Sequence, residues 1–182
     1  MSKLQNALAA AGCAQTQPAE RPVLILEKQL MDTLELQWHV QQVRIRSNGA
    51  TTKKTRILFD GMSSELQTFI GAIRKRLESW RKEDSHILEM GPSPYWRLFA
   101  VDGIELREQF EALICGYVHY EKQTTEAIAS LRRLGDLESV ELLGAILKAV
   151  ERCIWYLAIY LEALALNSDG NRLPEWPAAA AL

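Results

Sequence analysis

RILFDGMSSELQTFIGAIRKRL, residues Arg56–Leu77, carries the clearest periodicity in the chain. Apolar side chains recur in it at steps of three and four, which places them on one stripe of an α-helix. The stripe consists of Phe59, Met62, Leu66, Phe69, Ile73 and Leu77. A second set shares another face, because spacings of four and eleven residues are close to whole numbers of turns: Arg56, Asp60, Gly71 and Lys75. We therefore predict a long helix, from about residue 52 to 82, with separate apolar and polar faces.

A first helix is expected before this one, from Arg21-Pro22 to between Ile45 and Ser47. Proline is tolerated in a first helical turn, and the Asn-Gly pair in residues 47–55 indicates a turn after the helix. Its apolar stripe is predicted at Leu26, Leu30, Leu34 and Trp38.

Two more helices are expected at about 105–134 and from about 136 to 166. Gly135 is suited to end the third in a left-handed conformation, and Ser139 or Asp136 to cap the fourth. Residues 84–105 lack periodicity and contain two prolines and two glycines, which indicates a long crossover. The sequence therefore predicts an all-α, ferritin-like four-helix bundle over residues 21–167, with tails at 1–20 and 168–182.

Composition is that of an ordinary globular protein, with 48% hydrophobic residues and a net charge of −2. This charge gives no general reason to expect nucleic acid or an anionic membrane as a partner. The three cysteines are odd in number and lack CxxC spacing, which favours a reducing cytoplasm over an oxidising compartment. No uncharged run is long enough to span a bilayer.

Three motifs in the expected order resemble the Dps family. LFDGM with the later IRKRL resembles the family's second helix, and LQWHVQQ stands where the family has His-Trp-Asn-Val. GDLESVELLGAILKAVERCIWYLAIYLEAL resembles its fourth helix almost position by position. Dps proteins are ferritin-like, form hollow twelve-subunit shells, oxidise and store iron, and in many members bind DNA. The resemblance therefore implies a homo-oligomer of twelve subunits.

The family's di-iron site lies between two subunits and uses two histidines and several carboxylates. By the resemblance, the first histidine position, beside Trp38, is Gln37 here, and the second is Arg56. Asp60 matches, but the following aspartate is Gly71 and the glutamate is Lys75. Iron prefers imidazole and carboxylate ligands, and two fixed cations oppose a bound metal. We therefore expect no catalytic residues, no metal and no assured cofactor there. Asp60 should instead pair with Arg56 or Lys75, from the same or the facing subunit.

Two other groups of charged residues are candidate sites. Asp136, Glu138 and Glu141 begin the fourth helix, where Dps proteins line a threefold pore with acids that draw cations, so iron could enter a shell there. The alternative is that these acids only complement a helix dipole. Arg44, Arg46, Lys53 and Lys54 are the residues we would expect to contact DNA, since the tails carry few cations. A solvated charge run is the alternative.

Three functions remain open at this stage. The first is a Dps-like shell protein without ferroxidase activity, with a structural, DNA-associated or partner-binding role. The second is a ferroxidase and iron-storage protein that uses a relocated site built from Asp60, His39 or other residues. The third is a non-catalytic subunit that co-assembles with an active Dps paralogue.

Overall fold

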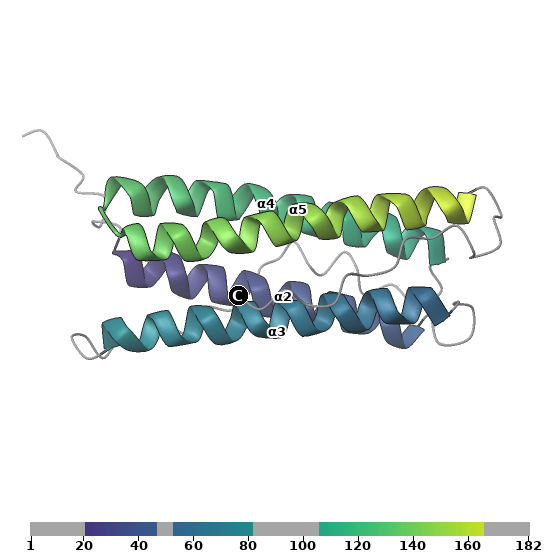
Figure 1. Ribbon diagram of the computed structural model, residues 1–182, viewed down its shortest axis with the longest axis horizontal. Helices are drawn as coiled ribbons and strands as arrows, with labels where there is room; N and C mark the ends of the chain where they lie inside the picture. Colours follow the sequence, from purple (N-terminus) through teal and green to yellow (C-terminus); the bar gives the residue numbers. More distant parts are fainter. Residues whose placement is uncertain (1–20, 47–52, 82–105, 166–182) are drawn as a thin grey trace, which may run out of the picture.

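The computed structural model describes residues 21–46, 53–81 and 106–165, and every regular element in this part is an α-helix. The helices are α2 (Pro22–Arg46), α3 (Lys53–Arg81), α4 (Leu106–Arg133) and α5 (Leu137–Ala165). Figure 1 shows them packed lengthwise into one elongated bundle. The predicted all-α four-helix bundle is confirmed, and each predicted helix matches within a few residues.

The helix directions explain the long connection between α3 and α4. Helix α2 packs against α3 and α4, and α5 packs against the same two helices, so α3 and α4 are diagonal. Arg76 meets Ser139 at one end of α3, and Tyr160 meets Lys54 at the other, so α3 and α5 are antiparallel. Because α4 is also antiparallel to α5, α3 and α4 run parallel. The chain must therefore travel back about 43 Å, the length of α3, before α4 begins. This is the single long crossover of ferritin-like bundles.

The predicted stripe of α3 forms the centre of the core. All six of its side chains are at most 2% exposed. Phe59 meets Phe110 of the diagonal helix α4, with 5.3 Å between ring centroids. Burying each such side chain contributes roughly 1.5–3 kcal/mol. The stripe therefore holds α3 against all three other helices.

The predicted stripe of α2 is correct at Leu26 and in part at Leu30, which packs against the core, but it is wrong at Leu34 and Trp38. Leu30 and Leu34 are only partly buried and Trp38 is 47% exposed. The buried face carries three polar residues among its apolar ones: Leu26, Gln29, Thr33, Leu36, His39, Val40 and Val43. Gln29 donates to the Thr124 hydroxyl at 2.8 Å, and the Thr33 hydroxyl lies 2.8 Å from that of Tyr120. Because α4 supplies these partners, polar side chains are accommodated in the core.

The turn between α4 and α5 follows the prediction. Gly135 has φ of 78°, which only glycine adopts without strain, and the Asp136 amide donates to the Leu131 carbonyl at 3.1 Å. The Asp136 carboxylate accepts from the Ser139 amide at 3.2 Å. Of the two expected capping residues, Asp136 is therefore the one that caps α5.

The corrected face of α2 predicts which of two leucines stabilises the bundle. Leu36 is fully buried, whereas Leu24 is 36% exposed. Leu36→Ala should lower the free energy of unfolding by about 2–5 kcal/mol, because it leaves a cavity in the core. Leu24→Ala, the matched control, should have a much smaller effect in the same denaturant titration. Equal losses for the two variants would contradict the assigned face.

Candidate functional site

The positions that the resemblance assigns to a di-iron site lie on the outside of α2 and α3. Exposed residues among them are Trp38, Arg56, Asp60, Gly71 and Lys75, and Gln37 is partly buried. Asp60 and Gly71 are eleven residues apart, which is about 16 Å along a helix. A Cβ added at Gly71 would meet nothing within 4 Å. One chain therefore does not gather this set, and only a second subunit would bring its two ends together.

Within the chain, Asp60 forms an ion pair with Arg44. We had expected Arg56 or Lys75 as its partner. Arg44 Nε lies 2.7 Å from Asp60 Oδ1, and both side chains are about half-exposed. The antiparallel packing of α2 and α3 places the last turns of α2 beside the first turns of α3, which the spacing along α3 alone does not reveal. At this exposure such a pair contributes only about 0.2–1 kcal/mol.

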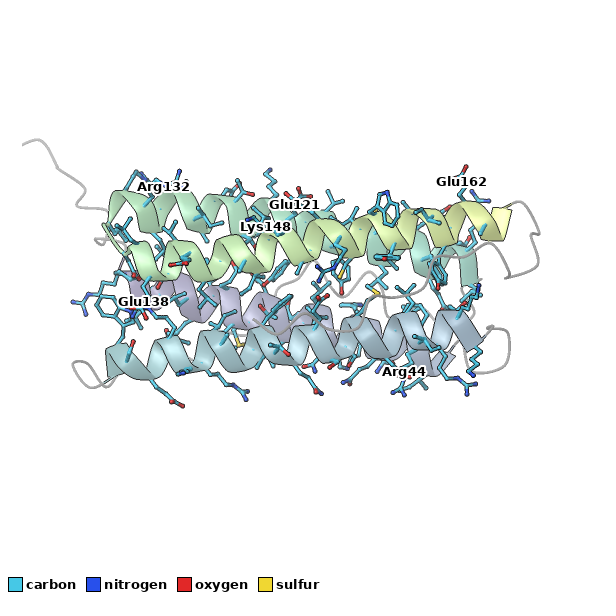
Figure 2. The ribbon with its side chains drawn as sticks, viewed as in Figure 1. Arg44, Glu121, Arg132, Glu138, Lys148 and Glu162 are labelled. Carbon is cyan, nitrogen blue, oxygen red and sulfur yellow. The ribbon has the colours of Figure 1, made fainter. Side chains whose placement is uncertain are left out.

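The basic cluster lies at the end of the bundle where α2 finishes and α3 begins. Lys53 is exposed, and the carbonyl of Lys54 accepts a hydrogen bond from the Tyr160 hydroxyl at 3.3 Å. Arg44 is engaged by Asp60, and the side chain of Arg46 lies outside the described part. Figure 2 shows Arg44 toward the opposite end of the bundle from Glu138. Contact of this cluster with DNA stays a prediction.

His39, the histidine considered for a relocated site, is buried in the bundle. It is 6% exposed, and its ring makes an edge contact with Trp38, with 5.0 Å between centroids. Burial lowers the pKa of His39 to about 4, so the imidazole is neutral at neutral pH. Asp60, by contrast, is half-exposed and paired with Arg44. Within the described ranges, no three or more His, Cys, Asp or Glu residues gather as a metal site.

The acidic start of α5 is joined to the end of α3 by Arg76. Its guanidinium lies 2.6 Å from Asp136 Oδ1 and 2.6 Å from Glu138 Oε2, and its Nε donates to the Ser139 hydroxyl at 2.9 Å. The guanidinium also lies 5.3 Å from the ring centroid of Trp80, within cation–π range. We call Arg76 with Asp136, Glu138 and Ser139 the Arg76 clasp.

The Arg76 clasp distinguishes Asp136 from the other two residues that we predicted at a pore. The Asp136 side chain is 4% exposed and serves as both helix cap and ion-pair partner. Burial alone would raise the pKa of Asp136, but hydrogen bonds from Ser139 and the Arg76 guanidinium outweigh it and lower the pKa. The Asp136 carboxylate therefore has its partners within the chain and is not exposed to a pore. Glu138, which is 76% exposed, and the exposed Glu141 keep their predicted place at a pore, a role that one chain does not test.

A second polar cluster lies deeper, between α3, α4 and α5. The Glu65 carboxylate pairs with the Arg152 guanidinium and accepts from the Cys153 thiol at 3.5 Å. Burial, followed by the Glu65 charge, raises the pKa of Cys153 well above its ordinary value. Burial likewise raises the pKa of the neighbouring Tyr117 hydroxyl. Both groups stay protonated at neutral pH, so this cluster is suited to packing and not to nucleophilic chemistry.

Comparison with known proteins adds no identity. No protein-family model matches the chain, and no curated protein or solved structure matches it either. No helix in the described part is long and apolar enough to cross a membrane.

Sequence reasoning missed Arg76 and Glu65, although their helical phase was visible. Arg76 follows Phe69 by seven residues, and Glu65 follows Leu58 by seven, so both fall beside the apolar stripe of α3. A charged residue in the phase of a buried stripe indicates a partner on a neighbouring helix. The partner itself depends on packing, and only the structure identifies it.

The clasp predicts a pH-dependent loss of stability. Asp136→Ala should lower the free energy of unfolding by about 3–5 kcal/mol at pH 7, because it removes the helix cap and leaves the nearly buried Arg76 with only the exposed Glu138 as an ion-pair partner. Asp136→Asn should cost less, since an amide still caps the helix. Because the folded pKa of Asp136 is lowered from 3.8, its charge stabilises the fold above pH 3.8, and this contribution is lost as pH falls through the folded value.

Denaturant titrations from pH 2 to pH 7 measure this effect. The difference between the wild type and Asp136→Asn should shrink below pH 3.8. The matched control is Glu138→Gln, whose exposed carboxylate should contribute no more than about 1 kcal/mol. A loss in Glu138→Gln equal to that in Asp136→Ala would contradict the assignment.

Proposed function

We propose that this chain is a shell-forming, Dps-like subunit without a working di-iron ferroxidase site. Its role is structural, DNA-associated or partner-binding. The three Dps-like sequence motifs support this proposal, as does the ferritin-like connectivity of the bundle. Arg56 and Lys75 support the loss of catalysis, because each cation would repel a metal ion bound beside it. Two like unit charges 4 Å apart at an effective dielectric of 20 repel by about 4 kcal/mol.

The observation that carries the proposal is a pair of exposed apolar surfaces on diagonal helices. On the α2–α3 side, Trp38, Ile45 and Ile57 are between 46% and 60% exposed. On the α4–α5 side, Trp155 is 56% exposed and Val118 46% exposed. Exposed tryptophans of this kind are typical of interfaces. Because α2 and α5 are diagonal, the two surfaces lie on different sides of the bundle, so one subunit can contact more than one neighbour, as a closed shell requires.

A self-assembling subunit should respond to a charge placed on the first surface. By size-exclusion chromatography with light scattering at micromolar concentration, we expect a closed oligomer, with twelve subunits the number that the resemblance implies. The double variant Trp38→Glu/Ile45→Glu should reduce the mass to half or less, because burying a carboxylate in an apolar interface is unfavourable. Ala129→Glu, at an exposed α4 position outside both surfaces, should retain the wild-type mass. A monomeric wild-type protein would overturn the proposal.

A shell without a ferroxidase site should not oxidise iron faster than the buffer does. With Fe(II) in air, we expect the wild-type protein to match a protein-free blank in the appearance of ferric absorbance. Asp60→Ala should leave this rate unchanged. A rate above the blank that disappears in Asp60→Ala would instead support the ferroxidase alternative with a relocated site. Elution of the chain together with an active Dps protein as one oligomer would support the mixed shell.

A further inference from the structure

A polar cavity of about 160 Å³ opens between α2 and α4. It is separate from the outer face of α3 and from the Arg76 clasp. Its volume corresponds to roughly five water molecules at about 30 Å³ each, enough for a small organic molecule. The polar lining used below consists of Lys28 and Asp32 from α2 and Gln123, Glu126 and Ser130 from α4.

Some acceptors in this cavity are engaged, since the Ser130 hydroxyl accepts a hydrogen bond from the Arg133 guanidinium at 3.0 Å. Among the described residues, one buried carboxylate oxygen of the lining has no donor. The Lys28 ammonium donates to Gln123 Oε1. The Asp32 Oδ2 atom is buried without a hydrogen-bond partner among the described residues. A buried carboxylate oxygen that lacks a donor is unfavourable, because it has lost its water without replacing it.

The charged groups around Asp32 also leave its carboxylate incompletely compensated. Burial raises the pKa of Asp32, and the charges of Lys28 and His119 only partly oppose this. Glu126 adds a second, exposed carboxylate to the cavity. With two carboxylates and one lysine in its lining, the cavity has a net negative charge. The group that fits is a cation that also donates hydrogen bonds.

We propose that this cavity binds the primary ammonium group of a small aliphatic molecule. An ammonium group has three N–H donors, for which Asp32 Oδ2 and the Glu126 carboxylate offer acceptors. Charge-assisted hydrogen bonds to a carboxylate are about twice as strong as neutral ones. Ile25 lines the same cavity and offers apolar surface to the carbon chain of the ligand. A calcium ion fits less well, because it requires six to eight oxygen ligands and Lys28 would repel it.

Two sources of the ammonium group are compatible with this lining, a simple amine and an amino acid. Lys28 distinguishes them. For a diamine, the Lys28 ammonium is a competing cation, so its removal strengthens binding. For an amino acid, the same ammonium faces the ligand carboxylate, so its removal weakens binding.

Equilibrium dialysis of radiolabelled putrescine against the full-length protein tests the proposal. We expect one molecule per chain with a dissociation constant of about 1 mM, as suits a ligand of few atoms. Asp32→Asn should weaken binding at least about tenfold, and Glu126→Gln by a smaller factor. The matched control is Glu151→Gln, which removes an exposed carboxylate from α5 and should bind like the wild type. Tetramethylammonium, a cation without N–H donors, should not displace putrescine.

Dialysis of a second ligand, radiolabelled L-alanine, shows whether the ammonium group belongs to a simple amine or to an amino acid. Lys28→Gln should bind putrescine more tightly if the ligand is a simple amine, and should lose alanine if it is an amino acid. Asp32→Asn should retain the wild-type melting temperature or exceed it, since Asp32 Oδ2 has no hydrogen-bond partner among the described residues and burial disfavours its charge. The proposal is overturned if Asp32→Asn binds both probes like the wild type, or if Glu151→Gln weakens binding as much as Asp32→Asn does.

Discussion

Burial of one stripe of α3 is the constraint on which the rest of the bundle depends. Helix α3 contacts both α2 and α5, and its stripe reaches the diagonal helix α4 through the contact of Phe59 with Phe110. Helix α4 lies across the core from α3, and it runs parallel to α3 because both are antiparallel to α5. The long connection before α4 is therefore a geometric consequence of this packing and needs no functional explanation.

Polar side chains inside the bundle help to define the register of the helices, whereas the apolar side chains stabilise their packing. Gln29 and Thr33 bond to α4, Glu65 bonds to Arg152 and Cys153 of α5, and the Arg76 clasp joins α3 to the start of α5. Burial of apolar surface is non-directional, whereas a buried hydrogen bond requires one partner at one distance. These interactions are thus expected to define the register of each helix pair.

The outer face of α3 and the α2–α4 cavity differ in the charges that they carry. The outer face of α3 carries cations where the Dps resemblance implies metal ligands, and it lies beside exposed apolar residues that suit contact with another subunit. The α2–α4 cavity carries carboxylates with unused acceptor capacity, and it lies within one chain. Assembly and small-molecule binding would therefore use different sides of α2 and can be disrupted separately.

The four helices, the stripe of α3, the glycine turn and the crossover could all be predicted from the sequence, because periodicity and turn chemistry are local properties. The residue types at Gly71 and Lys75 likewise led us to expect no metal there, an expectation that one chain does not test. The burial of Gln29 and Thr33, the exposure of Trp38, and the ion pairs of Asp60 with Arg44 and of Asp136 with Arg76 depend instead on how the helices pack. The physical reason is the same in each case. A polar side chain is stable in a core only beside its partner, and these partners lie on other helices, up to 95 residues away for Gln29 and Thr124.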